Sequence, residues 1–568
     1  MTTPTLVIVP LDDRPPNYEY PALLAQAAGC TPVLPPKAWL GTPWRTGNTD
    51  RLAAWLDDVA PTADALVAAL DTLGYGGLVN SRRSPDPADA VLARLHQLRE
   101  LKQAHPSLTI LAYSVLMRIS RANSAEEEKA YWEAYGARLF RMSYLEDRLA
   151  MMAGAPGDEE ELAALGAEVP QEIVNDYLHG RARNHEVNRA MIEWTALGIF
   201  DYLIVPQDDT VEYGWNIAER RRLQRLVHQL RIGDRVSIYP GTDETDMLLI
   251  ARYAAQRAGL APRVATRYSS VRAGQVITAY EDRPMEELIK AHLGPLAGSL
   301  TTEPSQADIV LYVNTPGEVQ GEGVDQYVLN VAHDDMYALE GKAQDAVEAY
   351  LRSPHLQHTL RERYSAQRDV REFARSLAAD MRAGRACAVV DVAYVNGADL
   401  ALGAALLNTV DLAHLVGYGG WNTAGNTLGS VLAHAVIRTL QVRGGATAAQ
   451  LNAHVAFLFT RFVDDYLYQA LVRPQVAFEV LPTLDHAPTM GDLGDLQGVV
   501  RDEVAKRLVE RAEELAVNAF AGHRIHGPDG PVTIDEIRID NVFLPWRRLF
   551  EVGFDVAVQL QTAGDDSP

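Results

Sequence analysis

Short aliphatic runs that end in acidic residues constrain the fold of this chain more than any other feature of its sequence. The run at 202–205 leads through Pro206 and Gln207 to Asp208 and Asp209. The same pattern occurs at 6–9 before Asp12 and Asp13, at 65–70 before Asp71, at 236–239 before Asp243 and Glu244, and at 388–390 before Asp391. A carboxylate at the mouth of a buried strand has to be solvated, paired or bound. Parallel-sheet enzymes hold their chemistry at the C-terminal ends of their strands, so the pattern predicts an α/β enzyme.

The spacing of these runs predicts a parallel-sheet core, because a longer helical stretch follows each expected strand. The expected strands are 5–10, 64–70, 108–115, 201–206, 235–240, 263–268, 308–313 and 386–391, with a further short one near 414–417. Eight strands that alternate with helices match the count of a (β/α)8 barrel, although two doubly wound sheets have the same spacing. We therefore expect a barrel-like α/β fold and keep two open sheets as the alternative.

The length of 568 residues predicts two or three domains. We assign 1–335 to an α/β catalytic portion with a helical insertion at about 116–198, in which Ser124 and the acids at 126–128 are expected to open a helix. The remainder, 336–568, is expected to be mostly helical and to contribute the late strands 386–391 and 414–417 to the core. The helices expected there are 346–382, 423–442, 447–472 and 499–521, followed by strand alternation at 554–558.

The composition argues against several classes of partner. Acidic residues (75) outnumber basic residues (52), so the chain lacks the basic footprint of a nucleic-acid-binding protein. No segment approaches the roughly 20 consecutive apolar residues of a membrane span, and the first residues carry no signal-peptide pattern. Only Cys30 and Cys387 occur, which is typical of a reducing compartment. We expect a cytoplasmic protein with no nucleic-acid or membrane partner, and we leave open whether it forms a homo-oligomer.

The first acidic pair belongs to a motif whose residues are typical of a ligand-binding site. Arg14 follows Asp12 and Asp13 directly, and Asn17 closes the motif after two prolines. An Arg beside a carboxylate lowers its pKa and holds it in one orientation, as a substrate clamp requires. The alternative is an Asp–Arg pair that only ties down the first loop of the sheet.

A glycine-rich segment follows the strand at 64–70. Asp71 begins it, and three glycines surround Tyr75 at 74–77, which predicts either a binding platform or a plain tight turn. Arg118, after the strand at 108–115, is a candidate for recognising a carboxylate or hydroxyl, with a salt bridge as the alternative.

The tetrapeptide at 74–77 recurs at 417–420 and continues into Trp421 and Asn422. An aromatic face next to an amide fork is a combination that recognises sugars. The alternative is that Trp421 anchors the core while Thr423 caps the helix that follows.

Three interpretations of Asp208 and Asp209 stay open. They are a glycosidase pair, with one carboxyl as general acid and the other stabilising positive charge on the sugar; a Mg²⁺ or Mn²⁺ site shared with Asp243 and Glu244; and a loop tie or helix cap. Neither an HExxH zinc motif nor a GxSxG nucleophile elbow is present. A further acidic pair, Asp464 and Asp465, lies inside an expected helix and is predicted to be a solvated face, with a ligand wall as the alternative.

The chain resembles the bacterial family known as domain of unknown function 4127 in three motifs: PLDDRP at 10–15, PQDD at 206–209 and GWNT at 420–423. The resemblance implies a bacterial cytoplasmic protein and brings no established activity with it. A second, local likeness is to hexosaminidases that use the acetamido group of their own substrate. It implies that Asp208 orients the acetamido group and that Asp209 is the acid.

We therefore predict an enzyme, a hydrolase that acts on a small glycoside or amino-sugar conjugate and needs no cofactor. The catalytic candidates are Asp208, Asp209, Asp243 and Glu244. The substrate-binding candidates are Asp12, Asp13, Arg14, Asn17, Asp71, Tyr75, Arg118, Asp391, Trp421 and Asn422. The alternatives are a hydrolase of phosphate or amide bonds that depends on Mg²⁺ or Mn²⁺, and a carbohydrate-binding protein without catalysis.

Overall fold

The aliphatic runs form strands of two parallel sheets, each in its own compact unit of the chain. The structure is a computed structural model that describes residues 3–334, 338–353, 356, 360, 368–486, 488–527 and 530–562. The first unit comprises residues 1–13, 30–249 and 280–283, and the second comprises 14–29, 250–279 and 284–568. The division expected at about 335 falls inside the second unit.

The sheet of the first unit has the order β2-β1-β3-β4-β5-β6, and every neighbouring pair in it is parallel. Its strands are β1 (Thr5–Val9), β2 (Thr31–Val33), β3 (Ala65–Ala69), β4 (Thr109–Tyr113), β5 (Tyr202–Gln207) and β6 (Val236–Pro240). All residues of β3 and β5 are buried, as expected of parallel strands that helices cover on both faces.

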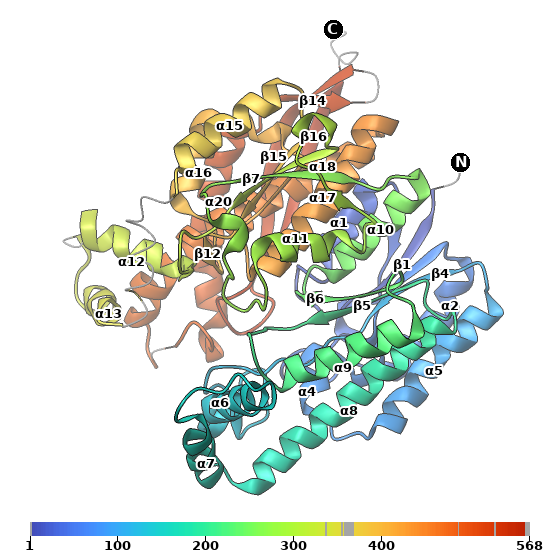
Figure 1. Cartoon of the computed structure of the whole chain (residues 1–568). Helices are drawn as coiled ribbons and strands as arrows, with labels where there is room; N and C mark the ends of the chain where they lie inside the picture. The colour runs from blue at the N-terminus through green and yellow to red at the C-terminus, as the bar shows by residue number, and fades with distance from the viewer. Residues whose placement is uncertain are drawn as a thin grey trace. The chain divides into compact units, whose positions relative to one another are not determined.

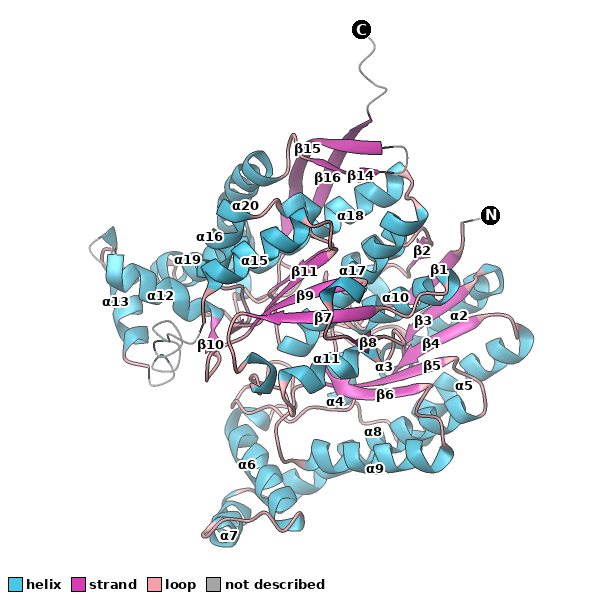
Figure 2. Ribbon diagram, turned by 45° about the horizontal axis from the view of Figure 1, so that its top comes forward, coloured by secondary structure: helices cyan, strands magenta, loops and turns pink. Residues whose placement is uncertain are grey.

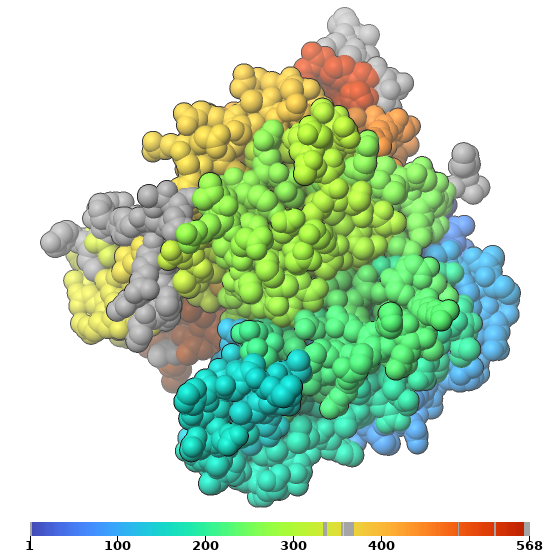
Figure 3. All heavy atoms as spheres, viewed as in Figure 1, coloured from blue at the N-terminus to red at the C-terminus, as the bar shows by residue number. Residues whose placement is uncertain are grey.

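The helices of the first unit include the predicted insertion. They are α2 (Thr49–Val59), α3 (Leu70–Tyr75), α4 (Leu78–Arg83), α5 (Ala88–Ala104), α6 (Trp132–Ala150), α7 (Asp158–Glu168), α8 (Gln171–Ala196) and α9 (Trp215–Leu230), and α10 (Thr245–Ala258) begins in this unit. Figures 1 and 2 show α8 and α9 side by side along one face of β5 and β6. The helices α6 and α7 form the blue-green surface at the lower end of this unit in Figure 3. The helix expected to open at Ser124 begins only at Trp132, and 124–128 form a loop.

The parallel sheet of the second unit has the order β13-β11-β9-β7-β8. Its strands are β7 (Arg263–Tyr268), β8 (Ser299–Leu300), β9 (Ile309–Asn314), β11 (Cys387–Asp391) and β13 (Gly417–Gly419). Two short strands, β10 (Gly321–Glu322) and β12 (Tyr394–Val395), pair with each other. An antiparallel sheet of β14 (Arg524–Gly527), β15 (Gly530–Phe543) and β16 (Gly553–Thr562) takes in the predicted strand at 554–558.

Helices make up much of the second unit, including the region after 335 that was expected to be mostly helical. They are α1 (Glu19–Ala27), α11 (Met285–Leu293), α12 (Gly323–Asp334), α13 (Lys342–Leu351), α15 (Val370–Arg382), α16 (Leu400–Thr409), α17 (Ala424–Gly444), α18 (Ala448–Arg461), α19 (Arg473–Gln475) and α20 (Gln497–Ala519), with π-helical segments η7 (Phe462–Val472) and η8 (Val476–Val480). Short 3₁₀ turns lie at Lys37–Trp39, Ala60–Thr62, Ala273–Gln275, Pro304–Gln306, Leu412–His414, Leu481–Thr483 and Gly494–Leu496. The single helix expected at 346–382 covers the end of α13 and all of α15, and most residues between them lie outside the described part of the chain.

The predicted α/β class with parallel sheets is confirmed. The strands are shared between two sheets, as in the alternative that their spacing left open, and no ladder of the described strands closes either sheet into a barrel. No helix in the described residues is both long and apolar enough to cross a bilayer.

Candidate active site

Asp208 and Asp209 follow β5 directly, and the structure gives them different surroundings. The side chain of Asp208 is 11% exposed, whereas that of Asp209 is 25% exposed. Asp209 has a positive φ of 42°, a conformation that Asp tolerates better than most residues. The left-handed turn separates the two neighbouring carboxylates, so each one has its own partners.

Asp208 is bound by a buried arginine that the sequence analysis did not select. Arg82, at the end of α4, pairs with Asp208 and also with Glu127 (Nη1 to Oε2, 2.9 Å). Glu128 lies 3.8 Å from the same guanidinium nitrogen. The predicted helix-opening acids at 126–128 therefore include two partners of a buried guanidinium, and their role as first-turn acids was wrong.

Arg118 pairs with Asp209 as Arg82 pairs with Asp208. Its guanidinium donates to Asp209 (Nη1 to Oδ2, 3.1 Å), to Glu127 (Nη2 to Oε2, 2.9 Å) and to Glu128 (Nε to Oε1, 2.9 Å). The backbone carbonyl of Arg118 in turn accepts from Arg181 of α8 (3.0 Å), which anchors this loop to the helix. The observed contacts of Arg118 are those of the salt-bridge alternative.

The pKa of Asp209 is raised to about 6: burial raises it most, the Arg118 guanidinium lowers it, and the charge of Asp208 raises it. A carboxyl group with this pKa exchanges its proton near neutral pH, which is the property that a general acid needs.

Asp209 lines a cavity of about 210 Å³. The other lining residues are Arg118, Ile119, Ser120, Arg121, Ala122, Phe140, Ser143, Thr210, Val211, Tyr213, Asn216 and Tyr280. Asn216 is 2% exposed, donates from Nδ2 to the Asp209 carbonyl (3.3 Å), and has no hydrogen-bond partner for its Oδ1 within the described residues. The cavity thus combines a proton donor, a buried amide acceptor and aromatic rings.

Further acids of the first unit lie around Tyr113, at the end of β4. Its hydroxyl donates to Asp246 (Oδ2, 2.9 Å), and burial raises the pKa of Asp246 well above its usual range. The charges of Asp12, Glu244 and Asp243 raise it further, so these three carboxylates lie close to Asp246. Asp246 itself was not among the sequence candidates.

Two other acids of this unit, Asp71 and Asp13, were also predicted to be site residues. Asp71 is buried and accepts from the Val115 amide (2.8 Å), and burial raises its pKa to about 7. Asp13 is half-buried.

The described residues contain no group of three or more His, Cys, Asp and Glu side chains that could hold a metal ion. Asp208 and Asp209 accept from guanidinium groups, and Glu244 lies against Gly241, where a Cβ atom would come within 2.5 Å of its Oε1. Asp208, Asp209, Asp243 and Glu244 therefore do not form the ligand set expected for Mg²⁺ or Mn²⁺.

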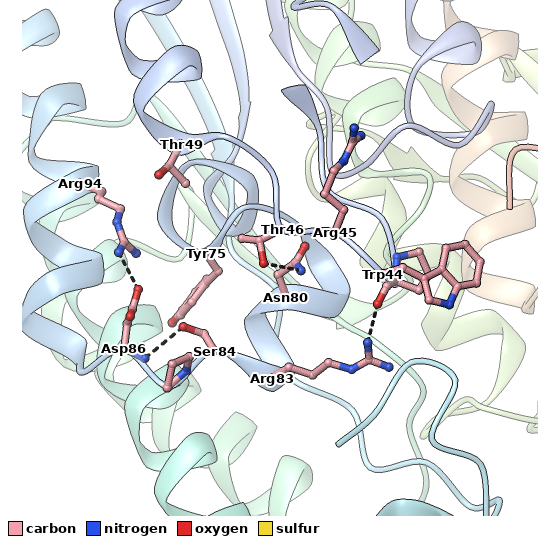
Figure 4. A pocket seen from close by; sticks show the side chains of 12 residues that line it. Trp44, Arg45, Thr46, Thr49, Tyr75, Asn80, Arg83, Ser84, Asp86 and Arg94 are labelled. Carbon is pink, nitrogen blue, oxygen red and sulfur yellow. Dashed lines mark hydrogen bonds and ion pairs between the residues drawn. The ribbon is translucent and has the colours of Figure 1, made fainter. Parts of the chain in front are cut away.

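Tyr75 lies in a different cavity, of about 450 Å³, which Figure 4 shows from close by. Trp44, Asn80 and Arg83 also line it, and the Arg183 guanidinium lies 5.1 Å from the Tyr75 ring centroid. The segment expected to be a loop or turn is the short helix α3, which ends at Gly76 in the left-handed conformation (φ 86°). Tyr75 and Asp209 thus belong to separate cavities.

Arg14 and Asn17 belong to the second unit. Arg14 is buried, pairs with Glu551 (3.3 Å) and lies over the Trp546 ring at 4.7 Å. The backbone N–H of Asn17 donates to the Arg14 carbonyl (3.0 Å), which closes the turn that the two prolines begin.

Asp391, at the end of β11, is buried in a polar network of the second unit. It accepts from the Asn314 amide (Nδ2 to Oδ1, 2.8 Å) and from the Asp399 backbone (2.8 Å), while Arg368 pairs with the Asp399 carboxylate. Burial and the charge of Asp399 raise the pKa of Asp391 to about 7.

Trp421 is 3% exposed and packs against Phe550 (ring centroids 5.8 Å apart). Asn422 has a positive φ of 67°, and its Oδ1 accepts from the Thr423 amide (2.9 Å). Thr423 caps α17 by accepting from Asn426. The observed contacts are those of the alternative in which Trp421 is a core anchor.

Asp464 and Asp465 are buried, so the predicted solvated face was wrong. Asp465 pairs with Arg461 and accepts from the Gly420 amide (2.6 Å), and Asp464 accepts from the Tyr20 hydroxyl (2.6 Å). Both acids lie on the π-helix η7, a geometry that often marks functional sites.

The residues that the sequence analysis missed are Arg82, Arg121, Glu127, Glu128, Asn216, Asp246 and Tyr280. Arg121 lies three residues after Arg118, so extending that strand-end motif would have included it. The others come from helices and distant loops, and no local pattern marks them.

The chain belongs to the family described as protein of unknown function DUF4127, whose model matches residues 6–555. No match to a curated protein or to a solved structure was found.

Proposed function

We propose that the first unit is a hydrolase that cleaves a small glycoside or amino-sugar conjugate, with Asp209 as its general acid. The observation that carries this proposal is the setting of Asp209, which lines a cavity together with Asn216 and the aromatic residues Phe140, Tyr213 and Tyr280. Enzyme pockets combine apolar walls with a few placed polar groups in this way. The volume, about 210 Å³, suits one small group such as a single sugar ring.

In this proposal Asp209 gives its proton to the leaving oxygen as the bond between that oxygen and the sugar carbon breaks. Water supplies the hydroxyl group that the sugar carbon gains, and the proton that this water releases restores the Asp209 carboxyl group. The Oδ1 atom of Asn216, which has no partner within the described residues, would accept a sugar hydroxyl.

Asp208 acts through its neighbour rather than on the substrate. It is held by Arg82 and does not line the cavity, but its charge raises the pKa of Asp209. We therefore assign Asp208 as a positioning residue whose charge raises the pKa of Asp209 towards neutral pH, a change from the charge-stabilising role expected from the sequence.

The test is turnover of a panel of aryl glycosides, including N-acetylhexosaminides and uronides, at a series of pH values. Asp209→Asn should abolish turnover. Asp208→Asn should keep part of it and shift the alkaline limb of the pH profile, expected near pH 6, to lower pH, because a charge that raises the pKa of Asp209 is gone. Asp502→Asn, at a side chain that is 70% exposed, is the matched control and should change neither property.

Stability separates a catalytic effect of Asp209→Asn from damage to the fold. The pKa of Asp209 is about 6 in the folded chain against an ordinary 3.8. The resulting stabilisation is complete below about pH 4 and is lost as the pH rises through 6. The variant should therefore be at least as stable as the wild type at pH 7.5. Turnover that survives Asp209→Asn would contradict the proposal, and sugar binding by a wild type that cleaves nothing would favour the carbohydrate-binding alternative.

A further inference from the structure

Arg121 presents a guanidinium group in the same cavity as Asp209, and no carboxylate of the described residues pairs with it. Arg118, three residues earlier, has three carboxylate partners. Arg121 instead donates from Nη2 to the Thr210 carbonyl (3.2 Å). Of the two arginines in the cavity lining, only Arg121 keeps its charge available to a ligand.

Two aromatic rings lie next to this guanidinium. Its central carbon lies 5.6 Å from the ring centroid of Phe140 and 5.2 Å from that of Tyr280. A guanidinium next to aromatic rings still offers its N–H donors, and the Thr210 carbonyl uses only one of the five. These donors can bind an oxyanion with two parallel hydrogen bonds.

The neighbouring Tyr280 is itself anchored next to Asp209. Thr210, which follows Asp209, donates to the Tyr280 carbonyl from both its amide and its hydroxyl (2.9 Å each). Asp282 accepts from the Gln207 side chain (3.1 Å), so the segment at 280–283 is bound both to the end of β5 and to the loop that follows it. The Tyr280 ring beside Arg121 is therefore carried by a segment that is tied to the loop of Asp209.

We infer that the substrate is a sugar that carries an oxyanion group, a carboxylate or a phosphate, and that Arg121 binds this group. The inference rests on the proposed function for the reaction at Asp209, but the binding of a sugar acid can be measured without turnover. The net charge of the whole chain is -23, so its long-range electrostatic field repels an anionic ligand. A local cation is therefore needed to bind such a ligand.

The experiment measures, by isothermal titration calorimetry on the full-length chain, the binding of D-glucuronate, its neutral amide D-glucuronamide, and D-glucose 6-phosphate. The wild type should bind D-glucuronate or D-glucose 6-phosphate at least about tenfold more tightly than D-glucuronamide, since a charge-assisted pair is lost in the amide. Which of the two anions binds identifies the oxyanion as carboxylate or phosphate.

Arg121→Gln should remove this preference and leave D-glucuronamide binding within about twofold. Arg121→Lys, which keeps the charge but loses the planar fork, should keep only part of it. Arg138→Gln, at an arginine of α6 whose side chain is 43% exposed, is the control and should behave as the wild type. Equal binding of acid and amide by the wild type, no binding of any probe, or a preference that survives Arg121→Gln would overturn the inference. If the inference fails in one of these ways, turnover of neutral glycosides would still support the proposed function. Binding of an anionic sugar that depends on Arg121, without turnover of any glycoside, would support Arg121 as the anion-binding residue and contradict the proposed hydrolase.

Discussion

Replacing Arg82 with Met should destabilise the first unit by about 3–5 kcal/mol, because it leaves the buried Asp208 without its paired guanidinium and leaves Glu127 and Glu128 with Arg118 alone. The side chain of Arg82 is 1% exposed and contacts Asp208, Glu127 and Glu128, whose side chains are 11%, 14% and 3% exposed. Met fills most of the volume, so the loss reports on charge rather than on a cavity.

The assay is urea unfolding followed by tryptophan fluorescence. With an m value of roughly 3 kcal/mol/M, the midpoint should fall by about 1–1.7 M. The loss should shrink as the pH falls, because protonation removes the uncompensated charges. Asp208→Asn combined with Arg82→Met should cost less than the sum of the two single changes, since the two residues share one ion pair.

The matched control is Arg138→Met in α6. Arg138 pairs with Glu168 at 2.7 Å, but the two side chains are 43% and 55% exposed, so this pair should contribute at most about 1 kcal/mol. Equal losses for the two variants would refute the argument that burial makes the Arg82 network costly to break.

Two further predictions concern the rest of the chain. His434 and His454 are buried and share one hydrogen bond (Nε2 to Nδ1, 2.8 Å), and burial lowers both pKa values, that of His434 to about 3 from 6.5. Their stabilisation is present above pH 6.5 and is lost as the pH falls, at about 2–3 kcal/mol for His434 by pH 4.5. Replacing both with Leu should flatten the dependence of unfolding free energy on pH between 7 and 4.5, and an unchanged slope would contradict this. Gly403→Ala in α16 should lower the melting temperature, because a Cβ atom there would overlap the Tyr466 ring, whereas Gly166→Ala in α7, with nothing within 4 Å, should raise it by stabilising the helix by up to about 1 kcal/mol. Melting curves that rank the two variants in the opposite order would show that the Tyr466 ring moves aside at no cost.

The sequence predicted the secondary structure of the sheets well. The run at 308–313 became β9 (Ile309–Asn314), and the helix expected at 423–442 became α17 (Ala424–Gly444) with Thr423 as its cap. These features depend on neighbouring residues, through side-chain branching, periodicity and capping. The division into two sheets was not predictable, because the spacing of strands and helices is the same in a barrel and in doubly wound sheets.

The candidate site likewise has features that the sequence determines and features that depend on the tertiary structure. Sequence alone determined that Asp208 and Asp209 follow a buried strand, and that such acids need partners or a ligand. Only the tertiary structure decided that Asp208 pairs with Arg82, 126 residues earlier, while Asp209 lines a cavity. Likewise the buried Asp464 accepts from the hydroxyl of Tyr20, 444 residues away. The cost of burying a charge depends on partners that the fold brings together, whereas strands and helices are specified by the residues beside them.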